Sequence, residues 1–234
     1  MGQSDTISII IPVLYEASII NRTIGGILNL PYDGKLEIIV VDGSPDGETL
    51  NAIGKNDIKK VISPKGRSYQ MNRGALDAHG EILLFLHADT ELPADALKTI
   101  SLVMGKREFV GGAFDLGIES EKPVFRLIEM AASFRSRVTR VPYGDQAIFV
   151  QKEYFLSSGG FREMPLMEDV EFMKRIRKAA DKIYIVPEKV KTSSRRWEKE
   201  GILCCTLRNW LLITLYSAGV PPDRLAALYR SNFK

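Results

Sequence analysis

The sequence has 234 residues, of which 45% are hydrophobic and 26% charged, a composition typical of a soluble globular protein. Its net charge of +3 is not gathered into a block of like charge, which argues against a nucleic-acid partner but is compatible with an anionic ligand or a membrane surface. The two cysteines, Cys204 and Cys205, are adjacent and lack zinc-ligand spacing, so we expect no disulfide and a reducing, cytoplasmic location.

The N-terminal part of the chain alternates between strand and helix patterns. Short apolar runs predict strands at 7–13, 36–44, 59–64 and 81–89, and helix-spaced apolar residues predict helices at 17–30, 48–54 and 66–80. The opening "MGQSDTISIIIPV" has no basic start and no cleavage site, so we expect a first strand there and not a signal peptide. This alternation predicts an α/β fold with a mostly parallel sheet, crossover helices, and a ligand site at the carboxyl ends of the strands.

The remainder of the chain continues with a less regular pattern. After Pro93 we expect a helix, a glycine-interrupted strand, a basic helix, a strand that enters a helix, another helix and a last strand: 94–104, 109–118, 122–140, 146–155, 168–180 and 182–190. The apolar stretch 202–220 contains Arg208 and Asn209, which favours a packed or interfacial helix over a membrane span. We expect a single domain over 1–234.

We expect that domain to divide into three parts. They are a nucleotide-type half of alternating strands and helices at 1–92, an elaborated half at 93–200, and an amphipathic helical tail at 201–234.

Acidic side chains follow two of the predicted strands. Asp42 suits a tight turn and equally suits a contact with the base or ribose of a nucleotide. Asp89 either caps the next helix or holds Mg²⁺ or Mn²⁺ against a diphosphate, with Glu91 as a second oxygen ligand. No G-x-G-x-x-G or P-loop motif is present, which argues against a dinucleotide-binding fold or a P-loop.

Further charged and polar residues each have two interpretations. Glu168 and Asp169 begin a helix, where the macrodipole favours acids, but one of them is also a candidate general base. Arg67 and Asn72 either contact phosphate or base, or cover a helix face. Arg196 in "SSRRW" is either solvated or neutralises a diphosphate leaving group.

Taken together, these segments resemble a family 2 glycosyltransferase of the GT-A fold. The resemblance rests on "ISIIIPVLYEASII", "IIVVDGSPDG", "GRSYQMNRGALDAHGEILLFLHADTELP" and "SSGGFREMPLMEDVEFMKRI", in that order and over nearly the whole chain. The segments "PYGDQAIFV" and "TSSRRWEKEGIL" further resemble a bacterial subgroup labelled "transferase 2, rSAM/selenodomain-associated".

The resemblance implies a role for each matching residue. It implies that Asp89 binds the metal, that Asp169 is the catalytic base, with Glu168 beside it, and that His87 stands where many members have the aspartate that contacts ribose. Residues 192–194 supply no glutamine for the motif of processive members, so we do not expect long processive synthesis. The substrate-binding residues that it implies, with Asp42 on the base, are Pro12, Glu16, Asp42, Arg67, Asn72, His87, Asp145, Gln146, Gly160, Arg196 and Trp197.

The predicted reaction is metal-dependent transfer of a sugar, with inversion, from a nucleoside-diphosphate sugar to an acceptor hydroxyl, and a UDP-type donor is expected from the resemblance. A nucleotidyltransferase is one alternative, although this chain has "PVLYEAS" in place of a glycine-rich basic signature. A non-catalytic sugar- or lipid-binding module is the other. We expect Asp42, Asp89 and Asp169 to converge on one cleft, which argues against a decayed site.

A membrane partner is a further hypothesis. Trp210 and Tyr216, together with Trp197 and a basic helix, predict a tail that lies on the inner face of a membrane, where a lipid-linked acceptor would be met. The alternative interpretation of the basic residues is a solvated helix face; they are Arg126, Arg135, Arg137 and Arg140.

Overall fold

The computed structural model describes residues 5–55 and 57–231, so both ends of the predicted domain, 1–4 and 232–234, lie outside the described residues. The elements in chain order are β1 (Ile7–Val13), α1 (Ile20–Leu28), β2 (Leu36–Asp42), α2 (Glu48–Asn51), β3 (Lys59–Ile62), α3 (Arg67–Asp77), β4 (Ile82–Phe85), β5 (Thr90–Glu91), α4 (Ala96–Gly105), β6 (Gly111–Glu119), α5 (Pro123–Thr139), the 3₁₀ turn η1 (Gly144–Gln146), β7 (Phe149–Gln151), α6 (Lys152–Ser157), α7 (Glu168–Lys178), β8 (Ile183–Ser193), α8 (Arg195–Glu200), α9 (Ile202–Ser217) and α10 (Pro222–Ser231).

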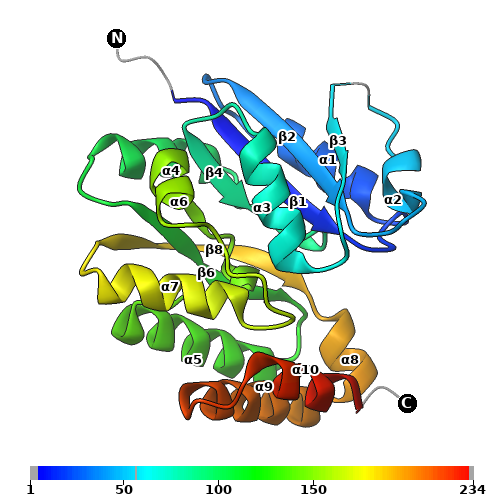
Figure 1. Cartoon of the computed structure of the whole chain (residues 1–234), viewed down its shortest axis with the longest axis vertical. Coiled ribbons are helices and arrows are strands. Elements are labelled where there is room, and N and C mark those ends of the chain that lie inside the picture. The colour runs from blue at the N-terminus through cyan, green and yellow to red at the C-terminus, as the bar shows by residue number, and fades with distance from the viewer. Residues whose placement is uncertain (1–4, 56, 232–234) are drawn as a thin grey trace.

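One sheet runs through the described residues in the order β3-β2-β1-β4-β7-β6-β8-β5 (Figure 1). Strands β1 to β4 are parallel to one another, β6 is parallel to β8, and β7 and β5 run antiparallel to their neighbours. The mostly parallel sheet with flanking helices that the sequence predicts is therefore present. The two-residue strand β5, which pairs Thr90 with Thr192, was not predicted.

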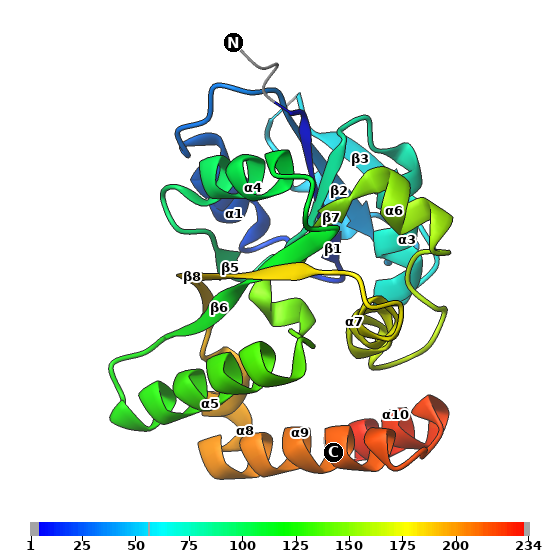
Figure 2. The ribbon, with the colours of Figure 1, turned by 90° about the vertical axis from the view of Figure 1, so that its left-hand side faces the viewer.

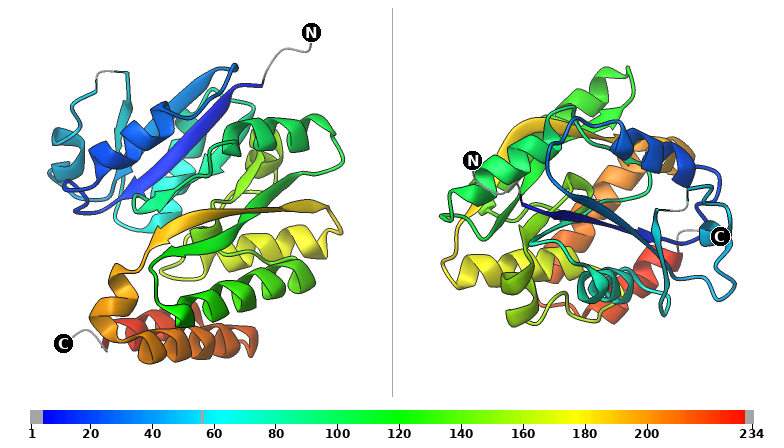
Figure 3. Two further views of the ribbon diagram at one scale, coloured as in Figure 1. Left: turned by 180° about the vertical axis from the view of Figure 1, so that it is seen from behind. Right: turned by 90° about the horizontal axis from the view of Figure 1, so that it is seen from above.

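Alternating side chains of β1 pack against helices on the two faces of the sheet. Ile9 and Ile11 belong to a core cluster that also contains residues of α1 and α4, whereas Ile10 belongs to a second cluster with residues of α3 and α7. Figures 1 and 3 accordingly show α3 and α1 on opposite sides of the sheet. Gly74 allows α3 to approach β1, because a Cβ there would lie 2.5 Å from Ile10 Cγ2.

The long pair formed by β6 and β8 extends the sheet toward the C-terminal helices. Its register moves from Phe114–Val186 to Asp115–Lys189, which leaves Pro187 and Glu188 in a bulge. A bulge accommodates a residue that cannot donate a ladder hydrogen bond and bends the strand. Helices α5, α9 and α10 lie at the end of the molecule away from β1 and β2 (Figure 2). Among the described residues, no helix combines the length and the apolar character needed to cross a bilayer.

Candidate functional site

A cleft of about 860 Å³ lies beyond the carboxyl ends of β1 and β4, bounded also by α3, α7 and the C-terminal helices. This is the sheet edge at which ligands bind in open α/β folds. Ten of the fourteen residues predicted for the site line it: Pro12, Glu16, Arg67, His87, Asp89, Asp145, Glu168, Asp169, Arg196 and Trp197. The other four, Asp42, Asn72, Gln146 and Gly160, do not line it.

Asp89 lies just beyond the end of β4, where it meets an arginine that the sequence analysis did not select. Arg195 Nη2 is 3.7 Å from Asp89 Oδ2 and 3.5 Å from Glu16 Oε2. Burial raises the pKa of Glu16, Arg195 opposes this shift, and the charge of Asp89 adds to it. The two carboxylates and the guanidinium therefore form one charged group. Only the doublet of arginines in "SSRRW" indicated it from the sequence.

The donor set at Asp89 fits a hard divalent cation. Mg²⁺ and Mn²⁺ take one or two protein carboxylates and complete their shell with phosphate oxygens and water. A third of the Asp89 side chain is exposed at the cleft, and Glu16 is near enough for the two carboxylates to interact electrostatically. Within the described part of the chain, no group of three or more His, Cys, Asp or Glu side chains gathers as a self-sufficient metal site.

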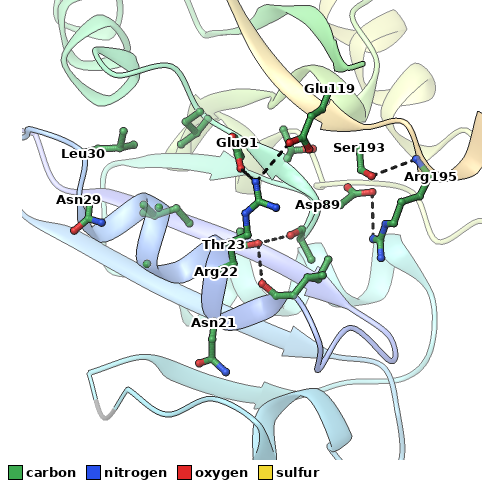
Figure 4. Close-up of a pocket in the computed structure, with 17 residues that line it drawn as sticks. Asn21, Arg22, Thr23, Asn29, Leu30, Asp89, Glu91, Glu119, Ser193 and Arg195 are labelled. Atoms are coloured by element: carbon green, nitrogen blue, oxygen red, sulfur yellow. Dashed lines mark hydrogen bonds and ion pairs between the residues drawn. The ribbon is translucent and has the colours of Figure 1, made fainter. Parts of the chain in front are cut away.

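A second hollow of about 590 Å³ lies on the α1 side of Asp89 (Figure 4). Asp89 and Ser193 border both hollows, and the far rim of the second is a salt-bridge network in which Arg22 Nη2 lies 2.5 Å from Glu91 Oε1 and 3.6 Å from Glu119 Oε1. Glu91 thus pairs with Arg22 and does not line the main cleft, so it is not positioned there as the second metal ligand that the sequence suggested.

Asp169 lies in the first turn of α7, with both carboxylate oxygens bonded to the backbone. Oδ1 accepts a hydrogen bond from the amide of Val170 (2.7 Å), and Oδ2 accepts one from the amide of Gly144 (2.5 Å). A Cβ on Gly144 would lie 3.1 Å from Asp169 Oδ2 and 3.3 Å from His87 Nε2. The glycine therefore allows the imidazole and the carboxylate to approach the same point of the cleft.

The neighbouring titratable groups are shifted by burial. The pKa of His87 is lowered well below its usual 6.5, first by burial and then by Arg67 and Arg196, so the imidazole is neutral at pH 7. Burial raises the pKa of Glu168; Arg67, whose Nε lies 3.8 Å from Glu168 Oε1, opposes this shift, and Asp169 adds to it. Poorly solvated acids at a cleft are candidate proton acceptors.

Asp42 lies outside the lining of the cleft. It is fully buried, Oδ1 accepts from the amide of Ser44 (2.8 Å), and Oδ2 accepts from the amide of Thr49 (3.0 Å). This is the turn aspartate that the sequence also allowed. Of the three acids expected at one cleft, Asp89 and Asp169 line it and Asp42 does not, and the contact of Asp42 with the base stays a prediction.

Asn72 and Gly160 hold a loop in place outside the cleft. Asn72 donates to Phe161 O (2.7 Å) and accepts from the Phe161 amide (2.9 Å). Gly160 has φ of +64°, and a Cβ there would lie 2.8 Å from Asn72 Oδ1. The loop that they fix continues into Glu163–Met167, which lines the cleft. Asn72 and Gly160 thus make positioning contacts, and a substrate contact of either residue stays a prediction.

Gln146 holds a second segment. It is fully buried, accepts from Ser136 Oγ (2.8 Å) and donates to Phe114 O (2.9 Å), which fixes the turn that carries Asp145 into the cleft. Burial raises the pKa of Asp145; Arg135 opposes this shift and Asp169 adds to it.

Trp197 and Arg196 form the C-terminal wall of the cleft. The ring of Trp197 packs edge-on against Phe125 with centroids 5.9 Å apart, and its Nε1 is buried without a hydrogen-bond partner among the described residues. Arg196 is exposed and lies over Tyr229, 5.5 Å from the ring centroid. The predicted pair is thus present at the cleft, with the tryptophan packed and the arginine accessible.

Comparison with known proteins gives one family match. The family model described as "Glycosyl transferase family 2" matches residues 8–163, about two thirds of the chain. No curated protein sequence matches the chain.

Solved structures resemble the chain over most of its length. TarS 1–349 of S. aureus in complex with UDP aligns with a TM-score of 0.65 and 16% identity over 80% of this chain and 60% of that one. Its complex with UDP-GlcNAc aligns with a TM-score of 0.64 and 17% identity over 80% of this chain and 58% of that one. The mannosyltransferase PcManGT from Pyrobaculum calidifontis, in complex with GDP-Man and Mn²⁺, aligns with a TM-score of 0.58 and 20% identity over 80% of this chain and 56% of that one. This chain therefore spans roughly three fifths of the length of these structures, and at such identities the likeness shows a shared fold, the GT-A fold expected from the sequence.

Proposed function

The chain belongs to glycosyl transferase family 2, and on that premise we propose that it moves a sugar from a nucleoside-diphosphate sugar to an acceptor hydroxyl. The observation that carries this proposal is the shared cleft of Asp89 and Asp169, with Arg67 and Arg196 beside them. One end of the cleft suits a diphosphate and the other offers a proton acceptor. The nucleotides bound by the similar structures, UDP, UDP-GlcNAc and GDP-Man, support a nucleotide-sugar donor, of which we propose the UDP type.

Asp89, with Glu16 beside it, would hold Mg²⁺ or Mn²⁺, as the Mn²⁺ in the mannosyltransferase structure also suggests. Such an ion supplies charge stabilisation to a departing diphosphate. Arg196 reaches the same cleft and carries a positive charge that an anionic leaving group requires.

The transfer that we propose is a single displacement with inversion. Asp169 accepts the proton of the acceptor hydroxyl, the oxygen bonds to the anomeric carbon, and the nucleoside diphosphate leaves with the electron pair of the broken bond. The Gly144 and Val170 amides fix the carboxylate for this role. Neutral His87, at the same point of the cleft, is able to donate or accept a hydrogen bond with the sugar.

The nucleotide base would lie near Pro12. The predicted contact of Asp42 with the base requires its carboxylate to leave the amides of Ser44 and Thr49. We also propose that the chain belongs to the subgroup labelled "transferase 2, rSAM/selenodomain-associated". We propose that its domain divides at residues 92 and 200 into a nucleotide-binding half, an acceptor and catalytic half, and a helical tail. We further propose that it acts in the cytoplasm, at the inner face of a membrane, on a lipid-linked acceptor.

Asp169→Asn tests the base assignment. We expect the variant to keep donor binding, measured by thermal shift with UDP-sugars and Mn²⁺, while transfer falls by about 10² to 10⁴-fold, since a positioned base contributes that much. Transfer at the wild-type rate would refute the assignment. Product analysis excludes the alternatives: a nucleotidyltransferase releases pyrophosphate in place of nucleoside diphosphate, and a binding module releases neither.

A further inference from the structure

Helix α9 exposes large apolar side chains to solvent, although it also buries Cys205 and Leu212 against the protein. An ordinary surface helix has polar residues on its outer face. Its inward face includes Arg208 and Asn209, and Arg208 Nη2 pairs with Glu200 Oε2 at 2.5 Å, with only about a tenth of either side chain exposed. Four large apolar side chains, each more than half exposed, form the outward face: Leu203, Leu207, Trp210 and Leu211.

Helix α5 likewise exposes apolar side chains on its outer face. Its inward face includes the fully buried Phe125, Glu129 and Ser136. Glu129 accepts a hydrogen bond from the Ile118 amide and pairs with Arg126 and Lys189, each at 2.8 Å. The outward face again has four large apolar side chains, each more than half exposed: Leu127, Met130, Phe134 and Val138.

The two helices are neighbours at one end of the molecule, as Figures 1 and 2 show from perpendicular directions. Buried Phe125 of α5 packs with Trp197 and Ile202 at the start of the tail. We call the eight outward side chains just listed on α5 and α9 the α5–α9 apolar surface. Exposed apolar area of this kind is uncommon on a protein that works without a partner and marks an interaction site.

The charges of these helices indicate the partner. Glu129 is the one acidic residue in the sequences of α5 and α9, and it is buried. Arg126 and Arg137 are basic and about half exposed, and the acids with which they pair, Glu129 and Asp115, are buried beneath them. A second copy of the chain docked symmetrically would bring the same arginines against one another. Apolar side chains with a tryptophan and a basic flank match an anionic lipid surface. We infer that the α5–α9 apolar surface docks on an anionic lipid bilayer.

Docking there deepens the proposed function, on which this step depends, by giving a structural reason for a membrane-held acceptor. Asn209, Leu212 and Ile213 on the inward face of α9 line the cleft. One helix thus has the cleft on one side and the bilayer on the other, so the cleft opens close to the lipid surface. The acceptor hydroxyl belongs to a membrane-held amphiphile, whose apolar part stays in the bilayer while its head enters the cleft.

Vesicle co-sedimentation of the full chain tests the docking without any catalytic step. We expect binding to phosphatidylcholine vesicles that contain phosphatidylglycerol, weaker binding to phosphatidylcholine alone, and partial loss at high salt. The double variant Leu207→Gln/Leu211→Gln should lower the partition coefficient by about tenfold or more, because each leucine contributes apolar area. Leu102→Gln on α4, equally exposed but distant in the chain, is the matched control and should bind as wild type does.

Three results would overturn the inference: no binding of wild type to anionic vesicles, an equal loss in Leu102→Gln, or a dimer in solution that Leu207→Gln/Leu211→Gln dissociates. Nucleotide binding of the same variants is measured without vesicles. If vesicle binding holds and no variant binds nucleotide, the proposed function fails while the docking surface stands. If nucleotide binds and vesicles do not, the docking fails alone.

Discussion

Asn72→Ala separates a loop-positioning role from a substrate contact at a residue for which sequence and structure give different answers. The wild-type side chain makes hydrogen bonds of 2.7 and 2.9 Å with both backbone groups of Phe161. Each such bond contributes about 1 kcal/mol, and leaving part-buried backbone groups unpaired adds to the loss, so we expect a destabilisation of about 2–3 kcal/mol. The assay is urea unfolding followed by circular dichroism, at unchanged m-value.

The same variant should weaken donor binding only modestly, since Asn72 does not line the cleft and acts on it through the loop. Asn51→Ala is the matched control, because Asn51 is exposed and makes a single bond, to Asp46 O at 3.2 Å; its effect should stay within about 0.5 kcal/mol. If Asn72→Ala unfolds at the wild-type urea concentration yet loses the donor, the side chain is a ligand contact and the positioning argument is refuted.

Three further predictions concern charge. Arg195→Gln should tighten Mn²⁺ binding to the donor-free protein by about 1.4- to fivefold, because a half-exposed guanidinium that competes for Asp89 contributes about 0.2–1 kcal/mol. The affinity is measured by electron paramagnetic resonance of free Mn²⁺, and unchanged affinity would exclude competition. The pKa of His87 in the folded protein should lie below 6.5 in an NMR titration. Because this pKa is lowered on folding, the free energy of unfolding should fall as pH falls through 6.5, with a limiting slope of about 1.4 kcal/mol per pH unit. His87→Gln should remove this slope, and a slope retained in that variant would contradict the assignment. Glu129→Ala should cost about 1–3 kcal/mol in urea unfolding, because it leaves the buried Ile118 amide without its acceptor, and a loss below about 0.5 kcal/mol would mean that the site is solvated.

The sequence predicts well those features that depend on local pattern. Apolar runs locate β1, β2 and β4, and the rule that parallel strands present their carboxyl ends at one edge places Glu16 and Asp89 together. What it misses depends on contacts between distant segments. Arg195 and Arg196 are equivalent in sequence, and only the orientation of α8 directs one to Asp89 and the other to Tyr229.

Paired partners that lie far apart in the chain explain the other differences. Asn72 meets the backbone of Phe161 across 89 positions, and the two-residue strand β5 exists because β8 passes beside it. Neither pairing has a local signature. Asp42 shows the limit of a motif: a strand-end aspartate before Gly and Ser satisfies a turn and a ligand equally well, and without ligand the turn amides take both its oxygens.

The inward polar groups of α5 have a physical connection to the cleft. Arg135 and Ser136 donate from this helix to Gln146 Oε1, at 3.0 and 2.8 Å, and Gln146 anchors the turn whose Gly144 amide bonds Asp169. These groups therefore help to fix the segment that holds the proposed base. The opposite face of the same helix carries the exposed apolar stripe. A bilayer that covers this stripe would stabilise α5 and, through Gln146 and Gly144, the position of the proposed base. Docking would then affect transfer without a conformational change.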